Sequence, residues 1–388
     1  MRLHLILPRV EPEQFVLPTV CPNAGCGGQH FRRHQRVAKS VLDTVYEAVM
    51  AERYECLRCH HTFRVYPLGV SREHTSRRVK GLAVMLYLLG FSYGAASLAL
   101  EALGVYVCKS RVYDAVQEVA ARVPGLKREA VFQDLRTPAV GGDVTSVKCR
   151  GQWLPLGLSV DATSGLVLTV DRLSNEEAGT LTQWLAPIAQ ATGAQLLVSD
   201  DADGFKIVAD DSGLEHQVCK SHVGRNTDAL IDSLTPAVAQ DSDGSLAALN
   251  LSPEQAVADL AHLREMIRIR QPEQHAELKA LHRRYVGAAP PRPGQPASLA
   301  YRLRLLFLDR WNLWPRLTRY RTWRGPHGER LDGTNNACER AIGWWIKERY
   351  RTMRGYKRQQ SAVNVSRLLA WCGNHLDRGG ANLAALFA

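Results

Sequence analysis

The segment Gly142-Asp143-Val144-Thr145-Ser146-Val147-Lys148 alternates in the manner of a half-buried β-strand. Residues 153–160 and 165–170 predict two more strands, and turn-forming residues lie between them. Three consecutive strands with short connections predict an antiparallel meander. The acidic residue Asp143 lies on its first strand.

After the meander, the sequence changes to helices that alternate with strands. Ser174 or Asn175 is expected to cap a helix that has Glu176 and Glu177 in its first turn, where the helix dipole favours carboxylates, and that ends near Ala191. The remaining elements are a short strand (196–198), a short helix (205–209) and a strand (215–218). This β-β-β-α-β-α-β order predicts an α/β fold with a mixed sheet.

Two acidic residues fall at matching places on this sheet. Asp143 lies on the first strand, and Asp200 follows the fourth, which is expected to run parallel beside the first after a helical crossover. Two facing carboxylates need a counter-charge, and oxygen ligands suit Mg²⁺ or Mn²⁺. The pattern therefore predicts a site for two metal ions of the kind that supports phosphoryl transfer.

Other acids compete for these two positions. Asp200 is preferred because it comes directly off the apolar strand, and Asp143 is preferred because its rivals precede the strand or begin a turn. The rivals are Asp201 and Asp203 for the former, and Asp134 and Asp161 for the latter.

The candidate for a third metal-binding acid is Glu339, far downstream. Thr334 or Asn335 can cap the helix that carries it. Ala341, Trp344 and Trp345 continue the inward face of that helix, so Glu339 is expected on an apolar side where an unpaired carboxylate would be costly. The Trp pair is expected in the core rather than against DNA bases.

Basic residues follow Glu339 and predict a phosphate-binding surface beside it. The side chains expected to bind DNA there are Lys347, Arg349, Arg351 and Arg354.

Two close cysteine pairs near the N-terminus predict a structural zinc site with four thiolate ligands. The pairs are Cys21 with Cys26, and Cys56 with Cys59. A strand-like stretch at 41–53 joins them, as in a zinc ribbon. Replacement of one thiol by His60 or His61 is the alternative.

Residues 76–89 and 92–103 have apolar side chains at helical spacing, and Ser110 could cap a third helix. Helix, glycine turn, helix and a short polar-faced helix favour a helix-turn-helix over a plain helical linker, with Lys109 and Arg111 as DNA-binding side chains. The uncharged stretch 81–100 approaches the length of a membrane span, but the polar and glycine residues 90–94 break it into two helices.

The charge is unevenly distributed along the 388 residues, whose formal net charge is +11. Residues 1–128 carry +8, residues 129–260 carry −12 and residues 261–388 carry +15. An acidic middle between basic flanks indicates carboxylate chemistry beside a polyanion. The N-terminus lacks the apolar run of a secretory signal, so a cytoplasmic protein with reduced cysteines is expected.

Together, the segments around Asp143, Asp200 and Glu339 resemble the three acids of DDE-type transposases of bacterial insertion sequences, which have a ribonuclease-H-like core. Mutator-like transposases are similar in having a Cys-x-x-His element after the second Asp, here Cys219 and His222. The phrase Asn335-Asn336-Ala337-Cys338-Glu339-Arg340 is also similar to another insertion-sequence group, so the subfamily stays open.

The resemblance implies a ribonuclease-H-like mixed sheet with a helical insertion, preceded by a zinc ribbon and a helix-turn-helix. The expected ranges are 1–70 for the ribbon, 71–130 for the helix-turn-helix, 131–225 with 325–388 for the core, and 226–324 for the insertion. It further implies metal-dependent cleavage and strand transfer of double-stranded DNA by a homodimer or a larger assembly, with Cys219 and His222 near the site. The alternatives are another ribonuclease-H-like nuclease and a non-catalytic DNA-binding regulator.

Overall fold

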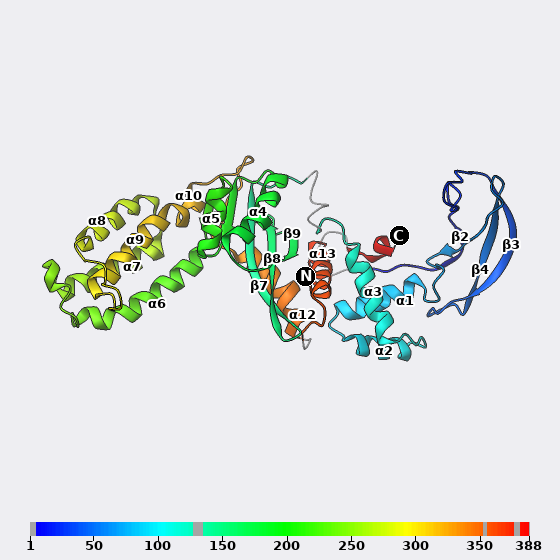
Figure 1. Ribbon diagram of the computed structural model, residues 1–388, viewed down its shortest axis with the longest axis horizontal. Helices are drawn as coiled ribbons and strands as arrows, with labels where there is room; N and C mark the ends of the chain where they lie inside the picture. Colours follow the sequence, from blue (N-terminus) through cyan, green and yellow to red (C-terminus); the bar gives the residue numbers. More distant parts are fainter. Residues whose placement is uncertain (1–4, 127–134, 352–354, 376–380, 388) are drawn as a thin grey trace. The chain divides into compact units, whose positions relative to one another are not determined.

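A computed structural model describes residues 5–126, 135–351, 355–375 and 381–387, and Figure 1 labels its elements. The chain divides into two compact units. Unit 1 comprises Met1–Lys127, Val147–Trp153 and Gly343–Ala388, and unit 2 comprises Arg128–Ser146 and Leu154–Ile342. The division expected at residues 70, 130, 225 and 325 stays a prediction.

Unit 2 is built on a five-stranded mixed sheet of order β11-β10-β7-β8-β9. Its strands are β7 (Ala139–Cys149), β8 (Gln152–Asp161), β9 (Val167–Arg172), β10 (Leu196–Ser199) and β11 (Glu215–Val218). Strand β10 runs parallel to β7 and β11, whereas β8 and β9 are antiparallel. The mixed α/β architecture predicted from the sequence is confirmed. The far end of β7 and the start of β8 belong to unit 1.

Helices α4 (Ala178–Thr192) and α5 (Asp203–Asp211) cover one face of the sheet (Figure 1). Trp184 of α4 and Phe205 of α5 pack with Val140 and Leu197 there, because alternate side chains of a strand point to the same face. Helix α4 begins after Glu177, which occupies the N-cap without a side-chain hydrogen bond, so the placement of both glutamates in its first turn was wrong.

The opposite face of the sheet carries Ala139, Leu196 and Val198, which pack against Trp323. Alternation along β7 places Gly141 and Asp143 on this second face as well. The candidate acids therefore lie on the face that α4 and α5 leave uncovered.

The segment between β11 and the second half of the site is mostly helical, as Figure 1 shows. Its helices are α6 (Lys220–Ala239), α7 (Pro253–Ile269), α8 (His275–Tyr285), α9 (Leu299–Leu317) and α10 (Arg319–Thr322), with short 3₁₀ turns at Ala247–Leu249 and Pro272–Gln274. Leu263, Tyr285, Phe307 and Trp314 are among the side chains fully buried in its own hydrophobic core.

Unit 1 contains a three-stranded antiparallel sheet and a group of helices. The strands are β3 (Phe31–Ser40), β4 (Ala48–Cys56) and β5 (Thr62–Val65), with small pairs β1 (Leu5–Ile6) to β12 (Ala381–Asn382) and β2 (Glu11–Phe15) to β6 (Pro67–Leu68). The strand expected at 41–53 is displaced, since β4 begins at Ala48 and a longer strand precedes it.

Three helices follow the strands: α1 (Arg77–Leu88), α2 (Tyr93–Ala102) and α3 (Lys109–Ala121). The hydroxyls of Ser76 and Ser92 accept hydrogen bonds from amides of the first turns of α1 and α2, which fixes where both helices begin. The cap expected at Ser110 was wrong, because α3 begins one residue after Cys108. Among the helices of the described residues, none has the length and apolar content that crossing a membrane requires.

The C-terminal helix α13 (Gln359–Asn374) packs against α3. The amide of Gln117 donates to Ser361 Oγ at 3.0 Å, and its carbonyl oxygen accepts from Asn364 Nδ2 at 3.1 Å. A 3₁₀ helix, Leu383–Phe387, completes the unit.

Arg349 lies on α12 (Glu348–Arg351), where it is only 5% exposed. Its guanidinium donates to the carbonyls of Gly90 at 3.2 Å and Phe91 at 2.8 Å, and it lies 4.2 Å from the ring centre of Tyr87. It therefore fixes the turn between α1 and α2 instead of being displayed to DNA as the sequence suggested.

Replacing Arg349 with Met is expected to destabilise unit 1 by about 1–3 kcal/mol, because the buried guanidinium and its two charge-assisted hydrogen bonds to the Gly90–Phe91 turn are lost. Thermal or urea unfolding followed by circular dichroism measures this loss. Arg351→Met is the matched control, since the Arg351 side chain is 74% exposed and should change stability by less than about 0.5 kcal/mol. Equal effects of the two variants would contradict the structural role of Arg349.

Candidate functional site

The register between β7 and β10 brings two of the predicted acids to the same level. Val198 lies opposite Gly141 in this parallel pair. Continuing the register by two residues puts Asp200 opposite Asp143, with both side chains on the same face of the sheet. Asp143 is half-buried and its Oδ1 accepts from the amide of Val144 at 2.8 Å. Asp200 Oδ1 accepts from a backbone amide in the turn that follows, at 3.1 Å.

The competing acids have other partners. Asp201 and Asp203 both contact the ammonium of Lys206, at 3.0 and 2.9 Å. Asp161 accepts from the hydroxyls of Thr137, Thr163 and Ser164, which fixes the turn after β8. The choice of Asp143 and Asp200 over these acids stays a prediction. Asp134 lies outside the described residues.

The third acid is on α11 (Asn336–Ala341), which approaches β7 at Gly141. A Cβ atom at Gly141 would lie 2.8 Å from Cys338 Sγ, a distance that side chains do not tolerate, so the close approach requires glycine there. Helix α11 therefore lies on the same face as Asp143. The side chain of Glu339 is 41% exposed, so it is not enclosed by apolar groups as expected.

The negative charges of all three candidate acids affect the thiol of Cys338. It is fully buried, and burial raises the pKa of its thiol well above the ordinary value; the negative charges of Asp143, Glu339 and Asp200 raise it further. Cys338 is thus held as a neutral thiol.

Cys219 and His222 contact the third acid. The amide of Cys219 donates to the carbonyl of Ser199 at 2.8 Å, which extends the β10–β11 pairing to the start of α6. A Cys219 sulfur, a His222 ring nitrogen and a Glu339 oxygen lie within 4.8 Å of one another, and His222 Nδ1 is 3.5 Å from Glu339 Oε1. Both residues that the resemblance placed near the site are therefore adjacent to Glu339.

The oxygen atoms of Asp143, Asp200 and Glu339 do not form one group within 4.8 Å among the described residues. Asn335 is 1% exposed, and its amide oxygen and nitrogen have no hydrogen-bond partner in the described part of the chain. A buried, unpaired amide beside Gly141 fits a ligand or a bound water.

The amide of Asn335 was missed at the sequence level, although it precedes Glu339 by four residues. Asn335 occupies the N-cap of α11, as one expectation had it, but its side chain makes no capping hydrogen bond. The hydroxyl of Thr334 bonds Asp332 instead, at 2.7 Å. The side-chain capping role was therefore wrong for Asn335, whereas the Thr334 hydroxyl also accepts a long hydrogen bond, 3.4 Å, from the amide of Asn336 at the start of α11.

Unit 1 brings the four N-terminal cysteines together. The Sγ atoms of Cys21 and Cys59 are 3.7 Å apart, as are those of Cys26 and Cys56. Tetrahedral zinc with bonds of about 2.3 Å needs sulfur atoms about 3.8 Å apart, so the four thiols fit the ion. His60 is 76% exposed and bonds Glu55 at 2.9 Å, which disfavours its exchange for a thiol.

The local environment of the thiols is uneven. The backbone amide of His61 lowers the pKa of Cys59 to about 6, and burial raises that of Cys21 to about 12. Gly28 allows the close packing, because a Cβ there would lie 2.7 Å from Cys56 Sγ.

The side chains predicted to bind DNA differ in their exposure to solvent. Lys109 and Arg111 are exposed on α3, and Lys347 and Arg351 are exposed further along the chain. Arg349 is buried, as described above, and Arg354 lies outside the described residues.

Trp344 is 55% exposed, so its placement on an inward face was wrong. The π-helical stretch Ile342–Lys347 accounts for this, since its wider turn shifts the side chains around the axis.

The sequence matches no protein-family model and no curated protein. Solved structures that match include the HTLV-2 integrase catalytic core domain in complex with magnesium. The trimeric form is 21% identical with a TM-score of 0.20, over 33% of this chain and 85% of that chain; the dimeric form is 21% identical with a TM-score of 0.19, over 33% and 86%. A simian T-cell lymphotropic virus intasome in complex with PP2A regulatory subunit B56 gamma is 13% identical, over 64% of this chain and 72% of that chain, with a TM-score of 0.20. At these values the matches define neither a family nor an activity for this chain.

Proposed function

We propose that this protein is a DDE-type transposase of an insertion sequence, with Asp143, Asp200 and Glu339 as its catalytic acids. One observation carries the proposal. The three acids come from β7, the end of β10 and α11, and α11 approaches β7 so closely at Gly141 that a Cβ there would lie 2.8 Å from Cys338 Sγ, the neighbour of Glu339. Acids so far apart in the sequence gather on one face of a mixed sheet, as the ribonuclease-H-like core implied by the resemblance requires.

In the proposed reaction, the carboxylates of Asp143, Asp200 and Glu339 would hold two Mg²⁺ or Mn²⁺ ions. Bound there, the ions would supply the charge that favours attack of a water or a 3′-hydroxyl on a phosphodiester and departure of the leaving oxygen. The chain supplies the fixed positions: the sheet register holds Asp143 level with Asp200, and the approach at Gly141 holds Glu339 on the same face. His222 Nδ1 lies 3.5 Å from the Glu339 carboxylate, close enough for an ion pair when the ring is protonated.

The remaining parts are assigned to DNA binding. The cysteine cluster would hold structural zinc, and α1 to α3 would act as a helix-turn-helix that reads the transposon ends. Lys109, Arg111, Lys347 and Arg351 would contact DNA phosphates, since each is exposed in unit 1. We expect a homodimer or larger assembly on paired ends, within the cytoplasm.

A strand-transfer assay tests the proposal. Purified protein is incubated with labelled DNA that carries the inverted repeats flanking its gene, a target plasmid, and either Mg²⁺ or EDTA. Metal-dependent nicking at the repeat ends, followed by joining to the target, is expected. Cleavage of RNA–DNA hybrids without end specificity would indicate another ribonuclease-H-like nuclease, and DNA binding without cleavage would indicate a regulator.

A further inference from the structure

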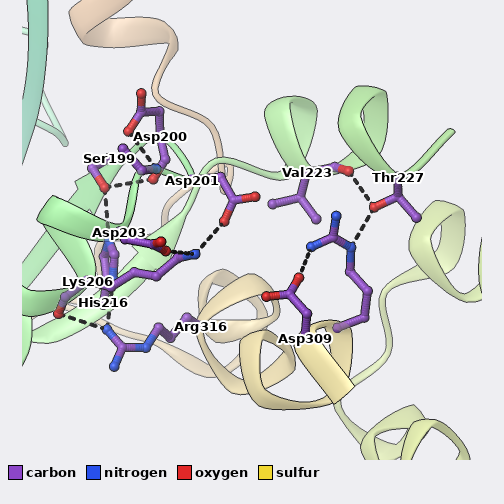
Figure 2. A network of polar contacts seen from close by, with 12 residues as sticks. Ser199, Asp200, Asp201, Asp203, Lys206, His216, Val223, Thr227, Asp309 and Arg316 are labelled. Atoms are coloured by element: carbon purple, nitrogen blue, oxygen red, sulfur yellow. Dashed lines mark hydrogen bonds and ion pairs between the residues drawn. The ribbon is translucent and has the colours of Figure 1, made fainter. Parts of the chain in front are cut away.

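A chain of buried polar groups leads from helix α9 to the backbone of Asp200 (Figure 2). Arg316 Nη1 lies 3.1 Å from His216 Nδ1, His216 Nε2 lies 2.9 Å from Ser199 Oγ, and Ser199 Oγ donates to the carbonyl of Asp200 at 2.9 Å. Ser199 is fully buried and His216 is 5% exposed. None of these groups belongs to the catalytic set proposed above.

The direction of every hydrogen bond in this chain is fixed by chemistry. A guanidinium can only donate, so His216 Nδ1 must accept from Arg316. The single hydroxyl proton of Ser199 goes to the carbonyl of Asp200, so Ser199 Oγ must accept from His216 Nε2–H. Both ends therefore demand the same neutral tautomer of His216. Burial, with the positive charges of Arg316 and Lys206, lowers the pKa of His216 to about 3, which agrees with a neutral ring.

Arg316, at the α9 end of this hydrogen-bonded series, also contacts two residues of α5. Arg316 Nη2 contacts both carboxylate oxygens of Asp210 at 2.8 Å, and its Nη1 donates to the carbonyl of Lys206 at 3.2 Å. Asp210 and Lys206 belong to α5, the helix that follows Asp200 along the chain. A single guanidinium thus joins α9 to α5, which follows the Asp200 turn, and to His216 on β11, which pairs with β10.

We propose that Arg316, His216 and Ser199 form a positioning relay that sets the backbone of Asp200 and couples it to the helical segment containing α9. The relay rests on the proposed function, because it matters only if Asp200 binds metal. Groups behind a metal ligand orient it, and their removal typically costs about 10–100-fold in metal affinity or activity. If α9 moves when DNA binds, Arg316, His216 and Ser199 would transmit that movement to the backbone of Asp200.

Ser199→Ala tests the relay with the least disturbance, since it removes one hydroxyl. We expect the Mn²⁺ dissociation constant, measured by calorimetry without DNA, to rise about tenfold, and kcat for strand cleavage to fall by a similar factor. KM for DNA should stay unchanged, because Ser199 is buried. The melting temperature should stay close to that of the unaltered protein.

Ser159→Ala is the matched control. Ser159 lies on β8 of the same sheet, is also fully buried, and its hydroxyl has no hydrogen-bond partner within the described part of the chain. This variant should bind Mn²⁺ and cleave DNA as the unaltered protein does. Equal behaviour of the two serine variants would overturn the relay.

A second variant tests the connection to α9. Arg316→Met removes the donor that faces His216 Nδ1 and the link from the ring to α9, so it should weaken Mn²⁺ binding as Ser199→Ala does. The double variant should lose little more than the worse single variant, because both changes break one chain. Fully additive losses would overturn the series connection.

Asp200→Asn separates failure of the relay from failure of the proposed function. If Asp200→Asn abolishes Mn²⁺ binding while Ser199→Ala does not weaken it, the relay is wrong and the catalytic assignment stands. If Asp200→Asn keeps full binding and cleavage, the assignment of Asp200 fails and the relay fails with it.

Discussion

Replacing Asp143 or Asp200 with Asn is expected to lower metal-dependent strand cleavage by roughly 10³-fold or more, the scale seen when a central catalytic group is removed. The amide keeps the size of the side chain but removes the charge that a divalent cation needs. The paired register ends at Val198 opposite Gly141, and its continuation by two residues would put Asp200 opposite Asp143, so either loss is expected to affect the same site. Single-turnover cleavage of a labelled repeat end measures the rate, and a filter-binding assay measures DNA affinity.

The control for this prediction is Asp203→Asn. The Asp203 side chain is 89% exposed and contacts Lys206, so its removal should change cleavage only a few-fold. DNA affinity should be similar for all three variants. Cleavage near the unaltered rate in Asp143→Asn would remove the catalytic assignment, whatever the behaviour of Asp203→Asn.

The placement of Asp143 and Asp200 could be predicted from the sequence because it depends on local pattern. An alternating strand and a short apolar strand after a helix fix both the order and the direction of pairing. The helical crossover allows the parallel direction, whereas the register that places Val198 opposite Gly141 is known only from the structure. The neighbours of each acid could not be predicted this way, since they depend on side chains from distant segments.

The environment of Glu339 could not be predicted from the local sequence pattern. Its order in the chain and its helix were predicted, but its exposure was not, because helix α11 is short and a π-helical stretch follows. The same irregularity turned Trp344 outward. The burial of Arg349 was missed for a related reason: the carbonyls that bind it belong to a turn 258 residues away, and only tertiary packing reveals them.

The predicted start of helix α4 was wrong for a simpler reason. The sequence placed Glu176 and Glu177 inside α4 because acids favour helix starts, whereas the helix begins at Ala178. Charge preference at a helix end acts over about one turn and is worth less than 1 kcal/mol at exposed sites, so packing of the apolar face decides the start. In α4 that face includes the buried side chains of Leu181 and Trp184.

Loss of the cysteine cluster is expected to have the largest effect on folding. Cys56→Ser should abolish tight zinc binding and unfold the ribbon strands β3 to β5, while unit 2 stays folded. Binding of a structural zinc ion in small zinc modules supplies about 10–16 kcal/mol, which is folding free energy because the site does not exist in the unfolded chain. The cluster is the only cysteine-rich group close to these strands in the described ranges, and its small hydrophobic contact with Phe31 is a weak substitute.

Zinc content by mass spectrometry and limited proteolysis between residues 15 and 70 measure these two effects. Cys372→Ser is the matched control, because Cys372 is a buried thiol of α13 that belongs to no group of candidate metal ligands among the described residues. The Cys372→Ser variant should keep one zinc per chain, and its ribbon strands should resist protease.

Because the cluster lies in unit 1 and the three acids lie in unit 2, Cys56→Ser should still bind Mn²⁺ with unchanged affinity while losing recognition of the repeat ends. Retention of zinc by Cys56→Ser would contradict the four-thiolate site, and loss of Mn²⁺ binding in the same variant would show that the two metal sites depend on each other.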